Sequence, residues 1–343
     1  MSAEGTRRST APGSAATAAG PGDAGPVHAA TAGEDAATRG GDHSRRTAAK
    51  QRARRRRALQ PTGLPWILPA FVVVVGLIYY SIGYTGYIST LDWDGTSPEP
   101  RGVGWGNYDQ LLHDPVFWAS IRHTVVFFAV TFTVQTALGF TLAALLHSRV
   151  KFPTLYKVIV FVPVVIAPAT MAPVFRQMFA ADGQFNSFLE AIGLGALAQP
   201  WLAQSSTALP VIMAIVVWQW TGVTFILYYA AMSQVDPEVL EAARIDGAGN
   251  LRTLVSIVWP AVRGTTAALA TLSVIGALKT FDVPWLVTIG GPNHATEFLG
   301  TDIYRSSIPE AHVGYGAALS VMLLLLAIGG ALLVGIRGLR QDR

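Results

Sequence analysis

Residues 241–260 read EAARIDGAGNLRTLVSIVWP, a segment of charged and small residues that separates two strongly apolar parts of the chain. Just before it, Asp236 and Pro237 predict the start of a helix, because an Asp side chain caps the first turn and a missing Pro N–H costs nothing there. About ten helical residues fit before Gly247, which can adopt the left-handed conformation that often ends a helix. Gly249 then begins a second short helix. The segment is therefore predicted to be a rigid helical unit.

One face of this unit is small, since Leu240, Ala243 and Gly247 recur at i, i+3 and i+7. Another backbone could approach such a face closely, with charged side chains at its rim. These charged residues are Glu241, Arg244 and Asp246. The alternative, from the residues themselves, is an ordinary helical turn that faces water.

The composition indicates a membrane protein. Of 343 residues, 51% are hydrophobic and only 13% are charged, which is too few to cover a soluble protein of this size. Apolar runs of about 20 residues recur, and each is long enough as a helix to cross a hydrocarbon core. The predicted fold class is an all-α polytopic membrane protein with six transmembrane helices. They lie at about 65–85, 123–146, 155–178, 208–231, 264–286 and 314–336.

The orientation follows from the distribution of Lys and Arg. With the N-terminus in the cytoplasm, the inner segments are rich in basic residues, whereas the outer segments are poor in them. The outer basic residues are Arg101, Arg122, Arg176 and Arg305. Both termini are therefore expected in the cytoplasm, and so is the unit at 241–260.

The N-terminal residues 1–60 have no apolar period and end in a basic run, KQRARRRR at 50–57. We expect this segment to be a disordered cytoplasmic tail whose Arg run orients the first span and contacts anionic lipid, not nucleic acid. It is not expected to be a cleaved signal peptide. The transmembrane domain is then 61–343, with the loop at about 236–260 inside it.

The segment 241–260 closely resembles the EAA loop of binding-protein-dependent ABC transporter permeases. That motif is Glu-Ala-Ala, three residues, Gly, nine residues and Ile-x-Leu-Pro. The matching residues are Glu241, Ala242, Ala243, Gly247, Ile257 and Pro260, while Trp259 stands where Leu is usual. In that family the loop is a coupling helix that sits in a groove of a cytoplasmic ATPase. The resemblance thus implies an ATPase-coupling role for Glu241, Ala242, Ala243, Asp246 and Gly247.

Further segments resemble the carbohydrate-type, MalF-like permeases. They are GNYDQLLHDPVFWASIRHT (106–124), YKVIVFVPVVIAP (156–168), FDVPWLVTIGGPNHATEFLGTDIYRSSI (281–308) and GYGAALSVMLLLL (314–326). The resemblance covers about 65–340 and implies the type I ABC importer permease fold in a bacterial plasma (inner) membrane. Its implied partners are a second, related but different permease subunit, cytoplasmic ATP-binding subunits and an extracytoplasmic sugar-binding protein. Its implied mechanism is alternating access.

Polar residues within the spans are candidates for the substrate path, because polar groups inside a bilayer are costly. The candidates are Trp218, Gln219, Trp220 and Thr221 in span four, and Ser273, Lys279 and Asp282 along span five. In the resembling family the sugar sits near mid-membrane, so we expect Trp218 or Trp220 to stack on a sugar ring. The alternatives are lipid-facing or interfacial Trp side chains, and a structural Lys279–Asp282 ion pair three residues apart on one helix.

Other functions lack their motifs. The chain has no Cys, no phosphate-binding G-x-x-x-x-G-K-[ST] motif and no G-x-S-x-G nucleophile motif, and its His residues have no metal-ligand spacing with carboxylates in a span. We therefore expect no enzymatic activity, no metal and no cofactor. Gly290-Gly291-Pro292 indicates a tight outer turn and not a phosphate cradle. The alternative function is an ion-coupled secondary transporter, which would be expected to show inverted repeats and paired intramembrane carboxylates.

Overall fold

The computed structural model describes residues 64–147 and 150–341, and side chains within 66–147 and 150–330. The chain divides into two compact units between Val74 and Val75, and each is described by itself. The described part of the first unit, residues 64–74, is the beginning of helix α2 (Leu64–Ile88). The predicted tail at 1–60 lies outside the described residues.

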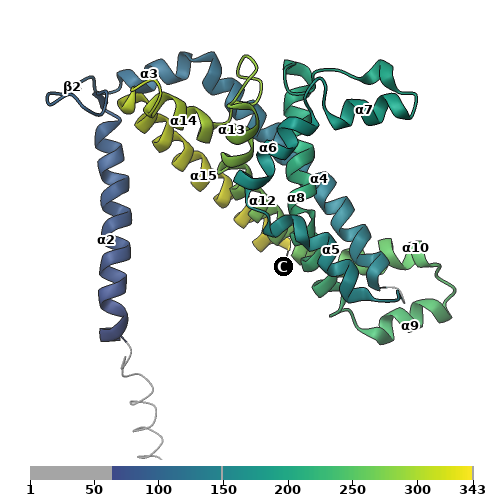
Figure 1. Ribbon diagram of the computed structural model, residues 1–343. Coiled ribbons are helices and arrows are strands. Elements are labelled where there is room, and N and C mark those ends of the chain that lie inside the picture. Colours follow the sequence, from purple (N-terminus) through teal and green to yellow (C-terminus); the bar gives the residue numbers. More distant parts are fainter. Residues whose placement is uncertain (1–63, 148–149, 342–343) are drawn as a thin grey trace, which may run out of the picture. The chain divides into compact units, whose positions relative to one another are not determined.

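The second unit is helical apart from one small hairpin, in which Leu91 of β1 (Leu91–Asp92) pairs with Gly102 of β2 (Arg101–Gly102). Its helices are shown in Figure 1. In chain order they are α3 (Gly106–His113), α4 (Pro115–His147), α5 (Pro153–Val165), α6 (Pro168–Met178), α7 (Gln184–Ala191), a 3-10 turn (Gly195–Leu197), α8 (Ser205–Met232), α9 (Pro237–Ile245), α10 (Asn250–Thr253), a π-helical turn (Leu254–Val258), α11 (Trp259–Ala261), α12 (Arg263–Leu278), α13 (Asp282–Thr288), α14 (Leu299–Ser307) and α15 (Val313–Gln341).

The predicted membrane spans are present as helices. Four helical segments are long and apolar enough to cross a membrane, and two bent helix pairs bring the number to six if each pair is one span. The four are Trp66–Ile88, Pro115–His147, Ser205–Met232 and Val313–Gly330. The fold class predicted from the composition is therefore confirmed.

The third span is not the single helix that was predicted. It breaks into α5 and α6, which meet at an angle of 93°. Ile166 and Ala167 between them are extended, because the residue before a proline disfavours helical geometry and Pro168 follows. With 13 residues, α5 is about 20 Å long, which is less than a hydrocarbon core of about 30 Å. Helix α5 alone is therefore too short to cross the core, and the chain bends sharply after it.

The fifth span also differs from its prediction at 264–286. Helix α12 ends at Leu278, and after a break at Phe281 a separate short helix, α13, begins at Asp282. The preceding segment at 250–261 bends by 64° against α12, because the helical hydrogen-bond ladder ends near Val262. The predicted end of this span was thus wrong by about two turns of helix.

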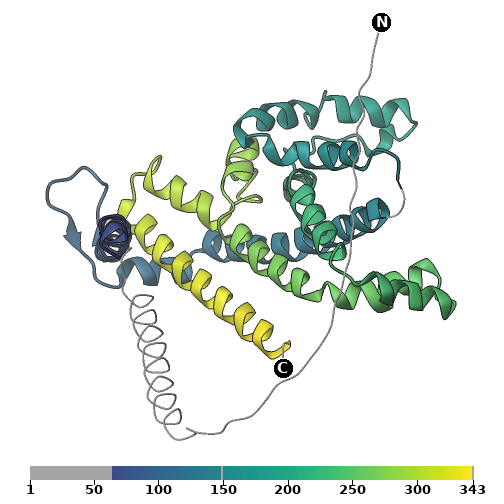
Figure 2. The same ribbon diagram turned by 90° about the horizontal axis from the view of Figure 1, so that it is seen from below.

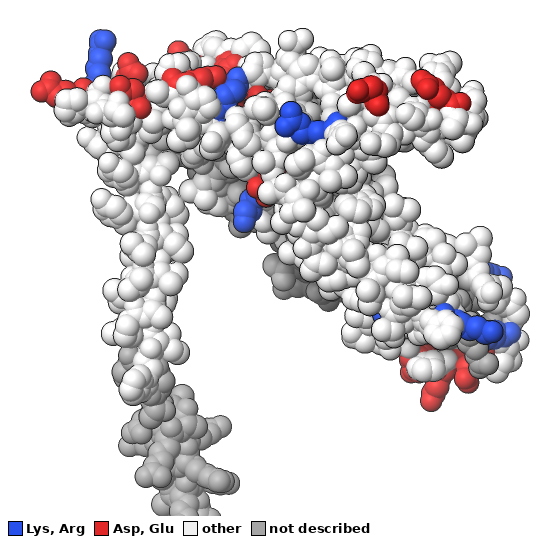
Figure 3. All heavy atoms as spheres, in the orientation of Figure 1, with Lys and Arg blue, Asp and Glu red and all other residues white. Residues whose placement is uncertain are grey.

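The core of the second unit forms along α4 and α8, which lie side by side, with α5 against α8 and α12 against α15 (Figures 1 and 2). One buried cluster contains Phe140, Phe225 and Tyr228, and another contains Phe127, Ile212 and Phe298. The charged side chains on the face in Figure 3 gather mainly at two ends, and the surface between them is almost uncharged. This distribution suits a protein whose middle lies in hydrocarbon.

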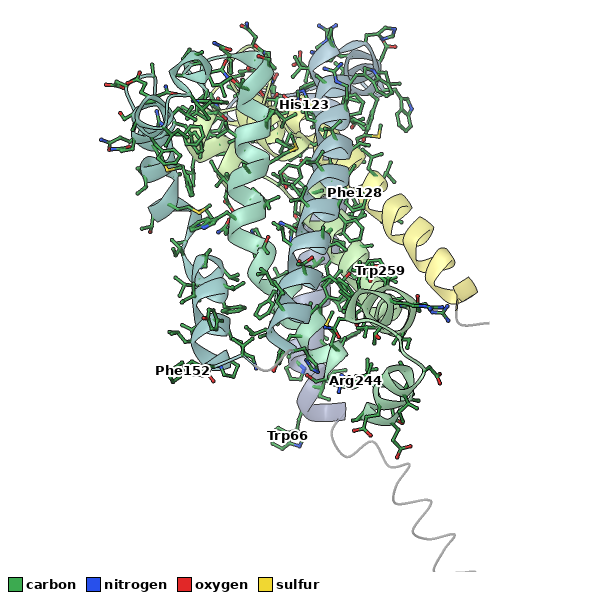
Figure 4. All side chains as sticks on the ribbon, turned by 90° about the vertical axis from the view of Figure 1, so that its right-hand side faces the viewer. Trp66, His123, Phe128, Phe152, Arg244 and Trp259 are labelled. Carbon is green, nitrogen blue, oxygen red and sulfur yellow. The ribbon has the colours of Figure 1, made fainter. Side chains whose placement is uncertain are left out.

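The two ends of the second unit carry different elements. Helices α9 and α10 lie at one end, and α7, α13 and α14 lie at the other (Figure 1). Figure 4 shows the same separation, with Arg244 at one end and His123 at the other. The candidate coupling residues therefore lie at one end of the second unit, and the candidate substrate-path residues lie along its helices α8 and α12 and at the start of α13.

Candidate functional site

The helical unit at 236–262 has the predicted local structure. Asp236 is the N-cap of α9, where its Oδ1 accepts a hydrogen bond from the Glu238 amide at 2.9 Å, and Pro237 is the first helical residue. At the other end Gly247 has φ +75°, and the Ala248 amide donates to the Ala243 carbonyl at 2.9 Å. These bonds satisfy carbonyls that the helix end would otherwise leave free.

The face formed by Leu240, Ala243 and Gly247 is free only in part, at Gly247, which is exposed with open space around it. Ala243 is buried at 7% exposure, and Leu240 packs against the cluster around Tyr228 and Val262. Leu240 thus connects the unit to its own helical bundle, and the buried Ala243 is not open to a second backbone. The opposite flank is free, because Ile245 is 86% exposed.

The rim of the unit is charged as predicted. Acidic and basic side chains lie together over α9 and α10 in Figure 3. The exposed charged residues of α9 and the turn after it are Glu238, Glu241, Arg244 and Asp246. An exposed apolar side chain among exposed charges is a typical composition for a protein-protein contact.

Trp259, which stands where Leu is usual in the EAA motif, is 38% exposed and contacts the helical bundle through its ring. Its ring meets Phe140 edge-on at 4.9 Å and stacks on Tyr228 with ring centroids 6.5 Å apart (Figure 4). The larger side chain thus joins the unit to α4 and α8. Its indole ring is accommodated because both neighbours are aromatic.

The four candidate residues in span four point in different directions. Trp218 and Trp220 are 43% and 46% exposed, whereas Gln219 and Thr221 are buried at 2% and 8%. Thr221 donates to the Val217 carbonyl of its own helix at 2.6 Å. Since residues two apart on a helix lie about 200° apart, the two Trp rings are on opposite flanks of α8. One sugar ring cannot stack on both.

Trp218 lies between two cavities of about 600 Å³ and 660 Å³, one toward α4 and α5 and the other toward α6. Both are lined almost entirely by apolar side chains. The Trp218 ring also meets Phe175 of α6 edge-on at 5.3 Å. A sugar needs several polar partners, so neither cavity alone is a complete sugar site.

The candidates of span five do not form the ion pair that was considered. Ser273 is half-buried on α12, but Lys279 caps the end of α12 and Asp282 begins α13. Both charged side chains are exposed, and no ion pair joins them among the described residues. The pairing was predicted for one continuous helix, and the helix ends between the two residues.

Within the described parts of the chain, no group of three or more His, Cys, Asp or Glu side chains could hold a metal ion. His123 is buried on α4, where its Nδ1 lies 2.9 Å from the main-chain oxygen of Glu297. The Nδ1 atom of His123 thus makes a structural contact with the main chain.

The family model described as binding-protein-dependent transport system inner membrane component matches residues 135–340. The chain belongs to this family. It is a membrane-embedded permease, a transport component and not an enzyme. The matched region contains α8 and the whole 236–262 unit.

Named relatives cover most of this permease. It is 30% identical over 271 residues to the probable ABC transporter permease protein YurN of Bacillus subtilis, covering 78% of this chain and 92% of the relative. It is 29% identical to the lactose transport system permease protein LacF of Rhizobium radiobacter, covering 81% and 94%. It is 30% identical to the diacetylchitobiose uptake system permease protein NgcF of Streptomyces coelicolor, covering 79% of each.

A solved structure shares the fold of the permease. A chain of a bacterial alginate ABC transporter, in complex with an alginate pentasaccharide-bound periplasmic protein, matches with a TM-score of 0.68 at 20% identity. The match covers 83% of this permease and 94% of that chain. The helical fold of this permease is therefore shared with a chain of an ABC transporter.

The permease also has a buried charged network that the sequence reasoning missed. Glu297 and Asp302 are each 1% exposed, although they belong to the connection between α13 and α15. Arg305 joins them, with its guanidinium 2.6 Å from Asp302 and 3.5 Å from Glu297. The spacing of Glu297, Thr301 and Arg305, each four residues apart, would have placed them on one helical face.

Burial governs the ionisation of this network. It raises the pKa of Asp302 to about 6, and the neighbouring Arg305 opposes the rise by favouring the charged carboxylate. One Asp302 oxygen, Oδ2, is buried without a hydrogen-bond partner in the described structure. A proton on this carboxyl group is therefore less costly than in water.

Proposed function

We propose that this chain is one membrane-spanning half of an ATP-driven importer for a sugar of disaccharide or oligosaccharide size. An extracytoplasmic binding protein delivers the sugar, and separate cytoplasmic ATP-binding subunits supply the energy. The spans then switch between outward-facing and inward-facing states. The second half is a related but different chain, and the complex lies in the plasma (inner) membrane with both termini of this chain in the cytoplasm.

The observation that carries this proposal is the 236–262 unit. It is a capped, rigid helix at one end of the bundle, and its Ile245 flank is exposed among charges. Such a helix can transmit force, because Leu240 packs against the cluster formed by α4, α8 and the π-helical turn. Lys and Arg residues favour the cytoplasmic side for this end.

Each coupling residue has its own part in this proposal. Glu241, Ala242 and Asp246 form the exposed contact with the ATP-binding subunit, and Ile245 adds an apolar anchor. Ala243 supports the helix from inside, and Gly247 ends it at φ +75°.

The substrate path runs along the exposed flank of α8 and the outer end of α12. Trp220 stacks on the sugar, while Ser273, Lys279 and Asp282 offer polar contacts. Trp218 shapes the neighbouring apolar wall, and Gln219 and Thr221 support α8 from its buried side. The relatives named for lactose and diacetylchitobiose support a sugar of this size.

The test is reconstitution of the complete complex in vesicles with its binding protein. A shift in the melting temperature of that binding protein identifies the solute. Uptake is then expected to require ATP on the side of the ATP-binding subunits. Accumulation of the solute by this chain alone, driven by a proton or sodium gradient, would instead establish the secondary transporter.

A further inference from the structure

The carboxylate of Glu297 is held by three neighbours from the same outer connection. Its Oε1 accepts a hydrogen bond from Thr301 Oγ1 at 2.7 Å, and its Oε2 lies 2.9 Å from His294 Nδ1. Arg305 Nε is 3.5 Å from the same Oε2. A buried carboxylate with charged and polar partners has a defined position, because any displacement leaves a charge unpaired.

This carboxylate presses against the turn that follows α13. Gly290 has φ +78°, and a Cβ atom at this position would lie 2.6 Å from Glu297 Oε2. Thr296 bonds both to this turn and to the end of α13, since its Oγ1 donates to the Gly291 carbonyl at 2.8 Å and lies 2.7 Å from Thr288 Oγ1. The turn after α13 therefore packs closely against the Glu297 carboxylate.

The loop held in this way has a strained backbone. Ile289, Asn293 and His294 all have positive φ, at 55°, 46° and 58°. The left-handed region is unfavourable for a β-branched residue such as Ile289, so this geometry persists only because its surroundings enforce it. The Ile289 side chain is nevertheless 57% exposed, so burial of that side chain does not explain the strain.

The same residue fixes the loop to the helical bundle. The main-chain oxygen of Glu297 lies 2.9 Å from His123 Nδ1 on α4, and the adjacent Phe298 meets Phe127 edge-on at 5.2 Å. This end of the bundle is opposite to the 236–262 unit (Figures 1 and 4). The loop is thus a rigid projection on the side where the binding protein is proposed to dock.

We propose that Glu297 is a positioning residue for transport, which holds residues 289–294 in a single conformation so that the extracytoplasmic binding protein docks on a preformed tip with Ile289 at its apolar contact. This inference rests on the proposed function. Its physical basis is that a loop ordered before binding loses less conformational freedom when the partner arrives. The partner surface is expected to have a small apolar pocket for Ile289.

The first experiment measures the ATPase rate of the complete complex in lipid nanodiscs against the concentration of the binding protein that supports wild-type uptake. Glu297→Gln keeps the size of the side chain but turns an amide toward His294 and Arg305. The half-saturating concentration is expected to rise about tenfold, with the maximal rate within about twofold of wild type. Thr301→Val removes one hydrogen-bond donor to Glu297. It should also raise the half-saturating concentration, but by less than tenfold.

The matched control is Glu190→Gln on α7, since Glu190 is an exposed carboxylate of the same end of the bundle. It should leave the half-saturating concentration unchanged. A wild-type half-saturating concentration in Glu297→Gln overturns the inference. If Glu297→Gln does not assemble, a wild-type half-saturating concentration in Thr301→Val overturns the inference.

A second measurement needs no binding protein. The chain has no Cys, so Asn293→Cys gives a single site for a spin label at the exposed loop. The label should be motionally restricted, and Glu297→Gln should make it more mobile. An identical spectrum in both backgrounds overturns the inference, whereas a wild-type complex that no binding protein stimulates contradicts the proposed function instead.

Discussion

Gln219 on α8 donates a hydrogen bond to the main-chain oxygen of Ile166, at 3.2 Å, across the break between α5 and α6. The Thr170 amide, four residues further on, donates instead to Ala167 at 2.9 Å, so the Ile166 carbonyl lies outside the helical ladder. A free carbonyl in a membrane costs several kcal/mol. Gln219 therefore stabilises the bend of the third span from a neighbouring helix.

Gln219→Leu is predicted to destabilise this bend. It removes the donor and leaves the Ile166 carbonyl unpaired, at a cost of about 1–3 kcal/mol. A lower melting temperature of the purified permease in nanodiscs would confirm the effect. Thr221→Val is the control, since its hydroxyl bonds only within α8. Equal melting temperatures for Gln219→Leu and wild type would contradict the bridging role.

Gly247→Val is predicted to uncouple ATP hydrolysis from uptake while the chain still inserts in the membrane. A Cβ at Gly247 meets no atom within 4 Å, so the substitution causes no steric clash. Its conformational cost of about 1–2 kcal/mol arises from the φ of +75°, which a residue with a Cβ adopts unfavourably. The end of α9 is therefore expected to shift. The readout is the number of solute molecules imported per ATP. Gly249→Ala serves as the control, because Gly249 has φ −67° and equally open space. Full transport by Gly247→Val would count against the coupling role.

Trp220→Ala is predicted to reduce uptake and to change the range of sugars transported. Loss of one aromatic face is expected to lower apparent affinity by about 0.5–1.5 kcal/mol. Trp218→Ala should instead lower the melting temperature, because Trp218 packs on Phe175. Competition between labelled and unlabelled sugars in vesicles measures the first effect. Unchanged uptake and range in Trp220→Ala would show that the sugar passes elsewhere.

Asp302→Asn is predicted to change how stability depends on pH. Burial raises the pKa of Asp302 from 3.8 to about 6, so the folded chain binds this proton more tightly than the unfolded chain. The stability that Asp302 contributes is thus complete below pH 4 and is lost as the pH rises to 6. The melting temperature of wild type relative to Asp302→Asn should fall over this window, corresponding to about 2–3 kcal/mol.

The control for this pH dependence is Asp109→Asn, since the Asp109 side chain is 81% exposed. Its difference from wild type at each pH is the baseline with which the Asp302→Asn difference is compared. An Asp302→Asn difference that follows this baseline would show that the Asp302 carboxyl group is not stabilised in its protonated form.

Local rules predicted the 236–247 helix well. Its cap at Asp236, its Pro237 start and its Gly247 end all depend on residues within a few positions, and the structure reproduces each. The same rules missed that Leu240 packs against side chains of α4 and α8, which are distant in the chain. The Lys279–Asp282 pair failed for a related reason, since a break at Phe281 separates the two helices.

The sequence by itself determined that this protein is a helical membrane protein with several apolar spans and a capped helical unit, because hydropathy and helix capping act within short segments. Tertiary structure decided which faces are buried, where the third span bends and how the charged groups pair. Glu297 shows the reason: its main-chain oxygen meets His123, which is 174 residues away in the chain. No local pattern encodes such a contact, because it forms only when the helices pack.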